Sequence, residues 1–374
     1  MKTGSRRKFL GHTIQAAGLV SLAAWPIRSR ADETGTAAEL VTKAVNFLRP
    51  RQAKDGSWSG DRKEPGITAI VVTAMLRSKR VTPGDPTATK ALTYLEQFLG
   101  PKGGLTEAPH SNYTTSIAIM AFHEANRNGR YDRIIKGGQE FLKTMQWDEG
   151  EGKGQESDVY GGAGYGGQNS RPDLSNTAFL MEALRDTGLS QDDPALQKAL
   201  VFVSRCQNLK SEFNDQAWAG KVNDGGFIYT AANGGSSVAG KTDNGGLRSY
   251  AGMTYAGLKS MIHAGLTLDD PRVKAAYDYI TKHYSLDENP GTGQRGLYYY
   301  YQTFAKAMAL IGKPTIVDAD GHAHDWRAEL TTALAKRQTA NGSWVNPADS
   351  FMEGDPNLVT AYGLLALAYA QKRS

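Results

Sequence analysis

From about residue 39 onward, the hydrophobic positions alternate between two helical patterns. In one pattern apolar residues recur every three to four positions, which is typical of an amphipathic helix with one buried face; in the other, apolar and small residues fill nearly every position, as in a helix buried on all sides. The two patterns alternate at residues 39–58 and 66–78, 87–105 and 112–128, 134–147 and 173–189, 194–210 and 249–266, 271–284 and 297–313, and 326–344 and 357–370. No alternating strand pattern of any length interrupts them. The sequence therefore predicts six helix pairs.

A repeated polar marker supports the same division of the chain. A glutamine ends the first helix of most pairs, at Gln52, Gln97, Gln146, Gln207 and Gln338, and His283 takes its place in the fifth pair. A glycine-rich loop follows each marker. Repeats of this kind bury their apolar faces by stacking on their neighbours. Several of the second helices are apolar on nearly every side, which predicts an inner ring of six buried helices inside an outer ring of amphipathic helices, an all-α, (α/α)6 toroid.

The first 31 residues are expected to be a leader and not part of the fold. Ser5 to Gly11 read "SRRKFLG", with adjacent arginines Arg6 and Arg7, and a modest apolar stretch and a small-residue cleavage site after Ala31 follow. This order is typical of a twin-arginine export signal, so we expect a periplasmic or extracellular protein. The apolar stretch is shorter than the about 18 residues of a membrane span. Residues 32–374 then form a single toroid domain.

The leader also explains the basic charge of the chain. The sequence carries 43 cations and 38 anions, and six of the cations lie in residues 1–31, which contain no anion. The mature chain is therefore close to neutral, which argues against nucleic acid as a partner. Cys206 is the single cysteine, so neither an intrachain disulfide nor a cysteine-rich zinc site is expected. A thioester-type toroid is also disfavoured, because Cys206 lies at the end of an outer helix without the downstream glutamine at the spacing that a thioester needs.

Two loops carry a more specific motif. Residues 52–58 read "QAKDGSW" and residues 338–344 read "QTANGSW". The motif resembles the repeat of squalene–hopene cyclases, other class II terpene cyclases and protein prenyltransferase β subunits, and the repeat pattern covers essentially the whole mature chain. We interpret Trp58 and Trp344 as structural residues that fold over the ends of their outer helices, with the glutamines bonding loose backbone groups.

The resemblance implies chemistry at the N-terminal ends of the inner helices. Class II cyclases begin one of these helices with Asp-x-Asp-Asp-Thr-Ala, whose middle aspartate protonates the substrate. Here the stretch is Asp173-Leu174-Ser175-Asn176-Thr177-Ala178. The predicted catalytic cluster is therefore Asp173, Ser175 and Asn176, with a hydroxyl where the family has its acid. The zinc ligands of prenyltransferases are also missing: Val359 stands where a histidine would be.

The remaining polar and aromatic residues near the predicted mouth are candidate ligand contacts. They are His110, Asn112, Tyr113, Tyr165, Arg248, Tyr250, Tyr299, Tyr300, Asp355 and Asn357. Aromatic faces among them would suit a carbocation. The run Tyr298 to Tyr301 cannot face the cavity as a whole, because helical phase turns about half of it outward. Asp173 has a second interpretation, as a plain helix cap.

Late in the chain, one segment concentrates possible metal ligands: Asp318, Asp320, His322, His324 and Asp325. Carboxylate and imidazole groups at this spacing are compatible with a metal site, but Asp325 also suits a helix cap and Asp318 to Gly321 an ordinary turn. An EF-hand is excluded, because its glycine and terminal glutamate are absent. We assign no metal and no cofactor.

Three classes of function stay open. The first is an exported terpenoid cyclase-like or prenyltransferase-like protein that binds or processes an isoprenoid or similar hydrophobic ligand. The second is a polysaccharide lyase or hydrolase on an α/α toroid, with Asp173 and Asp355 as acid and base. The third is a non-catalytic binding module. The expected partner is a small or lipid-like molecule; peripheral membrane contact and the oligomeric state are left open.

Overall fold

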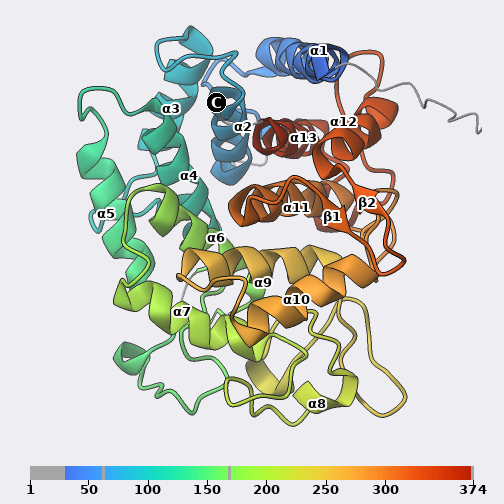
Figure 1. Cartoon of the computed structure of the whole chain (residues 1–374). Helices are drawn as coiled ribbons and strands as arrows, with labels where there is room; N and C mark the ends of the chain where they lie inside the picture. The colour runs from blue at the N-terminus through green and yellow to red at the C-terminus, as the bar shows by residue number, and fades with distance from the viewer. Residues whose placement is uncertain (1–29, 61–63, 167–169, 372–374) are drawn as a thin grey trace, which may run out of the picture.

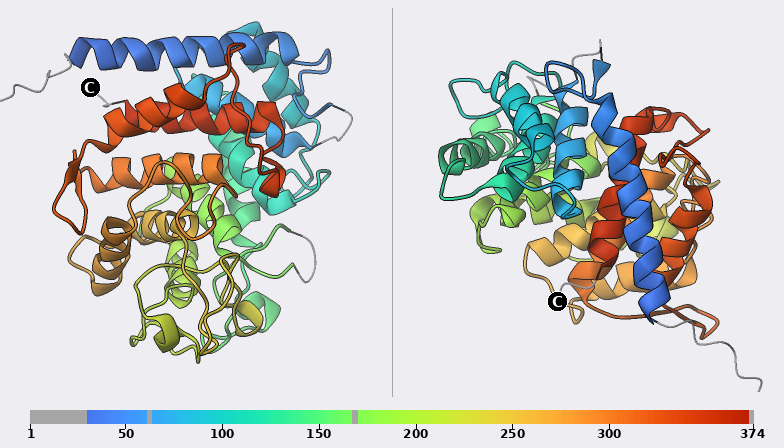
Figure 2. Two further views of the ribbon diagram at one scale, coloured as in Figure 1. Left: turned by 90° about the vertical axis from the view of Figure 1, so that its right-hand side faces the viewer. Right: turned by 90° about the horizontal axis from the view of Figure 1, so that it is seen from above.

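The computed structural model describes residues 30–60, 64–166 and 170–371, and their side chains from residue 37 on. The predicted leader, with Arg6 and Arg7, lies outside the described residues except at its last two positions. The helices of the described part form two layers, one inside the other (Figures 1 and 2). The inner helices are α2 (Pro65–Arg77), α4 (Ser111–Ala125), α6 (Leu174–Asp186), α9 (Ala251–His263), α11 (Leu297–Ile311) and α13 (Pro356–Ala370).

The outer layer contains α1 (Arg30–Leu48), α3 (Pro86–Glu96), α5 (Asp132–Lys143), α7 (Pro194–Arg205), α10 (Pro271–Lys282) and α12 (Trp326–Arg337). Each inner helix packs against the next, and α13 packs against α2, so the ring is closed. Helix α1 packs on both α12 and α13, which places the first and last helices side by side. The predicted all-α toroid is confirmed.

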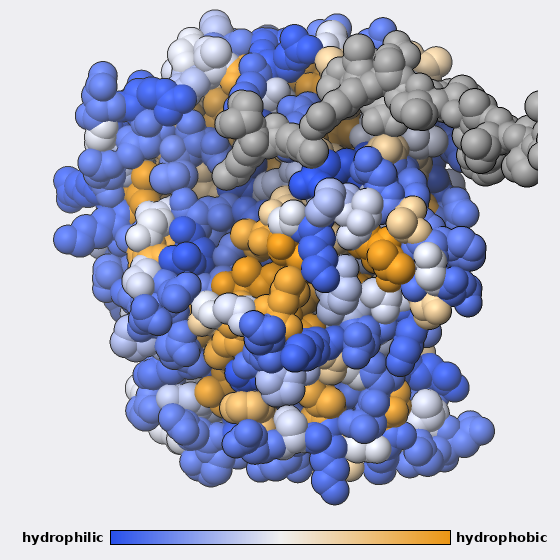
Figure 3. All heavy atoms as spheres, viewed as in Figure 1, coloured by the Kyte–Doolittle hydropathy of each residue, from blue (hydrophilic) through white to orange (hydrophobic). Residues whose placement is uncertain are grey.

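Short elements lie in the connections between the main helices. They are α8 (Ala219–Val222), and a hairpin of β1 (Ile316–Val317) and β2 (Ala323–His324) in which Ile316 pairs with His324. Within the described residues, no helix is long and apolar enough to span a bilayer. The face seen in Figure 1 is mostly hydrophilic, with apolar side chains gathered in patches near its centre (Figure 3).

Recurrent Asp-Pro pairs fix where several helices begin. Asp85, Asp193 and Asp270 each cap an outer helix by accepting a hydrogen bond from the amide two residues on, and a proline follows each of them. The carboxylate satisfies an amide of the first turn, and the proline supplies helical φ without losing a needed donor. Asp355 caps the inner helix α13 in the same way.

The marker glutamines connect each repeat to the next. Gln52 Nε2 donates to the Gly56 carbonyl of its own loop at 3.0 Å and to the Thr87 carbonyl in the first turn of α3 at 2.9 Å. Gln146 and Gln207 do the same: each donates one hydrogen bond to a glycine carbonyl of its own loop and one to a carbonyl in the first turn of the next outer helix, which is α7 for Gln146 and α10 for Gln207. Gln338 donates to Leu40 of α1 at 3.0 Å. The last repeat is thereby joined to the first, which helps to close the ring.

The loop packs so closely on the next outer helix that its motif position must be a glycine. Gly56 has a φ of +97°, and a Cβ there would lie 2.4 Å from the Lys90 carbonyl oxygen of α3. The tryptophans take the predicted structural place: Trp58 Nε1 donates to the Leu48 carbonyl at 2.8 Å, and Trp344 Nε1 to the Leu334 carbonyl at 2.9 Å. Both indoles are buried. Each one therefore satisfies a carbonyl in the last turn of its outer helix.

A buried cluster of charges, here called the ionic cluster, ties the C-terminal halves of the inner helices together. It contains Arg77 (α2), Glu124 (α4), Glu182 and Asp186 (α6), Lys259 (α9), Lys306 (α11) and Tyr369 (α13). Lys259 Nζ lies 2.5 Å from Glu182, and Arg77 lies 2.7 Å from Asp186. Burial alone would raise the pKa of Glu182, but Lys259, Lys306 and Arg77 hold it well below its ordinary value. The cations of the cluster thus keep Glu182 and Asp186 ionised at one end of the ring.

Candidate functional site

The opposite end of the ring, where the inner helices begin, holds a cavity of about 300 Å³. Its lining residues come from every inner helix and from the loops before them. They are Glu64, Gly66, Ile67, His110, Tyr113, Thr114, Tyr165, Ser175, Tyr229, Tyr250, Met253, Asn289, Thr292, Arg295, Gly296, Tyr299, Phe351, Met352, Leu358 and Tyr362. A larger groove of about 760 Å³ lies at the other end, between α1, α12 and α13, away from the inner-helix starts. The aromatic residues gather in the smaller, axial cavity.

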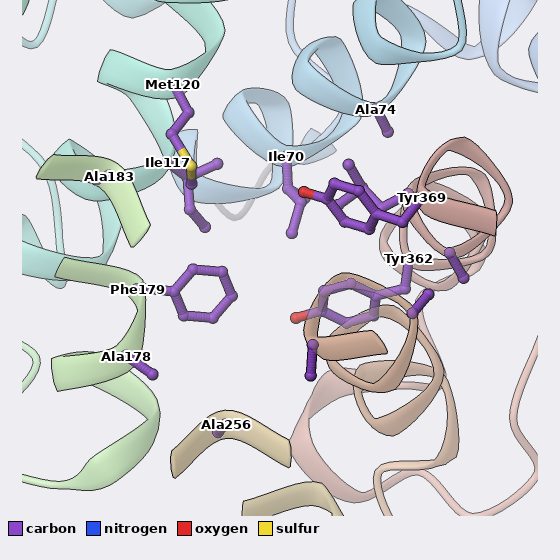
Figure 4. Close-up of a cluster of buried hydrophobic side chains, with 14 of the residues drawn as sticks. Ile70, Ala74, Ile117, Met120, Ala178, Phe179, Ala183, Ala256, Tyr362 and Tyr369 are labelled. Carbon is purple, nitrogen blue, oxygen red and sulfur yellow. The ribbon is translucent and has the colours of Figure 1, made fainter. Parts of the chain in front are cut away.

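Aromatic rings form the wall of the cavity and continue below it. Phe179 packs edge-on against Tyr113 with centroids 5.1 Å apart, and lies 6.2 Å from the ring of Tyr299. The hydroxyls of Tyr113 and Tyr362 are 3.3 Å apart. Deeper along the axis, Phe179, Tyr362, Ile117 and other apolar side chains point toward a shared space from different inner helices (Figure 4). The site therefore offers aromatic faces and aliphatic groups, with hydroxyls at intervals.

Asp173 lies behind this wall and not in it. Its Oδ1 accepts the Asn176 amide hydrogen at 2.9 Å and its Oδ2 accepts from Asn176 Nδ2 at 2.8 Å, so it does cap α6. The side chain is 2 % exposed. Burial raises the pKa of the carboxyl to about 6, although bonds from Asn176 and Tyr229 act in the other direction. This pKa leaves a proton on part of the Asp173 population near neutral pH.

Tyr229 connects Asp173 to the cavity. Its hydroxyl lies near enough to the Asp173 carboxyl to affect the pKa of that group, and Tyr229 also lines the cavity. Its position is set by the long loop between α7 and α9: the Tyr229 carbonyl accepts from the Leu174 amide at 2.8 Å, and Thr230 Oγ1 donates to the Pro172 carbonyl at 2.7 Å. The loop insertion of the fourth repeat thus brings a tyrosine hydroxyl between a buried acid and the ligand space.

The residues predicted at the mouth divide into two groups. His110, Tyr113, Tyr165, Ser175, Tyr250 and Tyr299 line the cavity. Ser175 Oγ donates to the Tyr299 hydroxyl at 3.1 Å, so Ser175 is joined to the aromatic wall.

The other predicted residues are placed elsewhere. Asn112 and Asn176 are buried against neighbouring loops and caps, Asn357 bonds the Trp58 carbonyl and Arg51, and Asp355 caps α13. Arg248 is exposed and its Nε donates to the Lys241 carbonyl at 3.0 Å. Tyr300 turns outward and its hydroxyl donates to the Ser285 carbonyl at 2.6 Å. Asp173 and Asp355 begin α6 and α13, which stand opposite each other in the ring, so they do not form an adjacent pair.

Several lining residues were not predicted. Tyr229 lies in a loop insertion, Tyr362 lies nearly two turns into α13, and Phe351 and Met352 lie in the short turn before that helix. Phe351 and Met352 have φ values of +59° and +64°, a strained conformation for residues other than glycine. That turn has no pattern in the sequence that marks it as part of the site.

The late acidic segment forms the tip of the β1–β2 hairpin. Within the described residues, side chains positioned to share a metal ion come together at Asp318, Asp320 and His322. His324 instead bridges Asp318 at 3.1 Å and Glu329 at 3.0 Å. Asp325 caps α12, as its second interpretation predicted. The hairpin does not contribute to the cavity lining.

Comparison of the sequence with protein-family models and with curated proteins gives no match. Solved structures do match the fold. The type II terpene cyclase MstE from Scytonema, in complex with its substrate geranylgeranyl dihydroxybenzoate, aligns with a TM-score of 0.56 and 14 % identity, over 91 % of this chain and 99 % of that one. Candida albicans protein geranylgeranyltransferase-I complexed with GGPP gives 0.51 and 14 %, over 88 % and 90 %.

A glycosyl hydrolase of family 88 from Bacteroides vulgatus also aligns, with a TM-score of 0.54 and 11 % identity, over 89 % of this chain and 98 % of that one. At such identities a structural match shows a shared fold and not a shared activity. The chain therefore has a toroid fold like that of terpene cyclases and prenyltransferases.

Proposed function

We propose that this protein binds an isoprenoid, or a hydrophobic chain of similar shape, in the axial cavity and acts on it there. The observation that carries the proposal is the wall of tyrosines around Phe179, on the axis of a closed ring. A ligand cavity of this type gains affinity from burying apolar surface, and a few polar groups fix its orientation. The volume of about 300 Å³ is at the small end for ligand cavities, which favours a short chain.

The solved neighbours support the proposal through their ligands. The cyclase structure holds a geranylgeranyl compound and the prenyltransferase structure holds GGPP. In this chain the corresponding space is apolar and aromatic, as an isoprenoid requires. The neighbours therefore favour the isoprenoid over other hydrophobic chains.

The proposed catalytic group is Asp173, acting through Tyr229. A serine hydroxyl at Ser175 is too weak an acid to protonate an alkene, whereas a carboxyl of pKa about 6 is suited to general acid catalysis near neutral pH. Because Asp173 is buried, its proton reaches the cavity along the Tyr229 hydroxyl. Asn176 positions the carboxyl through its two hydrogen bonds.

A non-catalytic binding module is the second candidate. Ser175 at the position of the family acid favours it, because a hydroxyl can hold a polar group of the ligand without reacting. The polysaccharide enzyme has less support, because Asp173 and Asp355 stand on opposite sides of the ring.

Export by the twin-arginine route is part of the proposal, supported by the "SRRKFLG" stretch. A lipid-like ligand in the periplasm would reach the cavity from a membrane. The exposed rim residues Tyr165, Phe351 and Met352 are compatible with such a transient contact, because apolar side chains at a water-facing rim gain from burial in the lipid interface.

The test is to identify what the purified protein retains. Lipids extracted from the wild type are analysed by untargeted mass spectrometry, beside two variants. Met253→Trp fills the cavity, while Val317→Trp adds the same bulk on the exposed β1–β2 hairpin. We expect an isoprenoid in the wild type and in Val317→Trp, and its loss in Met253→Trp. A co-purified oligosaccharide, or a lipid retained equally by all three proteins, would overturn the proposal.

A further inference from the structure

The axial cavity has one cationic side chain at its rim. Of the residues that line it, Arg295 is the one arginine or lysine and Glu64 the one carboxylate. Arg295 directly precedes Gly296, the N-cap of α11, whereas Glu64 is the N-cap of α2. Helix α13 stands between α2 and α11 in the ring, so the two charges occupy separate parts of the rim.

The Arg295 guanidinium has no charged partner among the described residues. Its Nε donates to Ser350 Oγ at 3.3 Å, and its Cζ lies 5.8 Å from the centroid of the Phe351 ring. These contacts hold the side chain over the mouth. Arg49, Arg77 and Arg272, by contrast, each pair with a carboxylate. Among the described residues, Nη1 and Nη2 of Arg295 make no hydrogen bond, so these donors can bind a ligand at the mouth.

The charge of Arg295 acts on Tyr250, a residue that lines the cavity. Burial raises the pKa of Tyr250 well above its ordinary value, and Arg295 acts on it in the opposite direction. Asn289, itself buried and lining the cavity, donates to the Arg295 carbonyl at 3.1 Å and fixes the backbone of this position. The cationic side chain is therefore built into the start of α11.

We propose that Arg295 binds the anionic head of an amphiphilic ligand whose apolar chain descends between Phe179, Tyr299 and Tyr362. This inference rests on the proposed function and deepens it, since it names the substrate class: a short isoprenoid chain that ends in a carboxylate or a phosphate. Arginine presents parallel donors that match either group, and such charge-assisted bonds are stronger than neutral ones. Neutral hydrocarbons and alcohols lack this contact and bind less tightly.

The test compares three ligands of one chain length by isothermal titration of the full protein. They are the short-chain compounds geraniol (neutral), geranic acid (carboxylate) and geranyl diphosphate, which suit the volume of about 300 Å³. In the wild type, the anionic ligands bind about tenfold or more tightly than the alcohol, as one charged hydrogen-bonding contact provides. The tighter of the two anions identifies the head group as carboxylate or diphosphate.

Variants then assign the preference to Arg295. Arg295→Met abolishes the difference between anion and alcohol, Arg295→Lys keeps part of it, and Arg295→Glu reverses it in favour of geranylamine. Arg248→Met is the matched control, because Arg248 lies two residues before Tyr250 but does not line the cavity; it keeps the full preference.

The outcomes separate this inference from the proposed function. Equal binding of all three ligands by the wild type, or a preference that survives Arg295→Met, overturns the assignment to Arg295 and leaves the isoprenoid cavity standing. A wild type that binds none of the ligands overturns the isoprenoid cavity itself.

Discussion

Replacing Asp173 with Asn should change how the stability of the protein depends on pH. Asparagine keeps an oxygen that can cap α6 but carries no titrating group. Burial raises the pKa of Asp173 from 3.8 to about 6, which corresponds to about 3 kcal/mol by linkage. Because the folded protein holds this proton more tightly than the unfolded chain does, the wild type should lose about that much stability as the pH rises from about 4 to about 6. Asp173→Asn should lack that loss.

The assay is urea unfolding of wild type and variant at several pH values between 4 and 7.5. The difference between the two free energies of unfolding cancels the other titrating groups, which both proteins share. It should move by about 3 kcal/mol in favour of Asp173→Asn as the pH rises. Above about pH 6 it should stay constant, since the carboxyl is then ionised in both states.

A second cap provides a control of opposite sign. Asp85 caps α3, and its hydrogen bond and ion pair with Arg49 lower its pKa. The ionised Asp85 therefore stabilises the folded protein at pH values above the pKa that Asp85 has in the unfolded chain, and this stabilisation is lost as the pH falls. Asp85→Asn should for that reason be most destabilising near neutral pH. If Asp173→Asn behaves like Asp85→Asn, or shows no dependence on pH, then Asp173 is an ordinary ionised cap and our account of the buried acid is wrong.

Three further perturbations test other parts of the account. Trp344→Ala should cost about 3–5 kcal/mol of stability in thermal or urea unfolding and leave ligand affinity unchanged; a selective loss of ligand would place the indole in the site. Glu182→Ala should cost about 3–5 kcal/mol, because it leaves buried cations without a partner, whereas Glu140→Ala, on an exposed pair, should cost less than about 1 kcal/mol; equal costs would contradict the ionic cluster. Replacing Arg6 and Arg7 together with lysines should keep the protein in the cytoplasm in a fractionation experiment; undiminished export would refute the twin-arginine signal.

The fold could be predicted because its signals are local and repeated. Apolar periodicity separates buried from amphipathic helices, and the glutamine and glycine of each loop mark where one helix pair ends. The role of Gln338 shows the limit of this reasoning. Its partner is Leu40, almost the whole chain away, so the sequence could indicate a polar contact but not that it joins the last repeat to the first.

Most of the site residues that could be predicted lie at the start of an inner helix, and Tyr165, in the loop before α6, is the exception. Ser175 and Tyr113 lie in the first turns of α6 and α4 and line the cavity. Tyr299 and Tyr300 are adjacent in the sequence, but about 100° of helical rotation separates them. Tyr299 therefore faces the axis, whereas Tyr300 packs into the outer layer. Tyr229 could not be found, because its place depends on hydrogen bonds made by an irregular insertion.

The most direct test of the central claim is to locate a bound isoprenoid within the ring. A geranyl analogue that carries a diazirine on its chain is photolysed with the purified protein, and the labelled peptides are mapped by mass spectrometry. The account predicts labels on peptides that contain Tyr113, Tyr299 or Tyr362, suppressed by excess unlabelled ligand and by Met253→Trp. Labels confined to the outer helices or to the groove between α1 and α12, and insensitive to Met253→Trp, would contradict it.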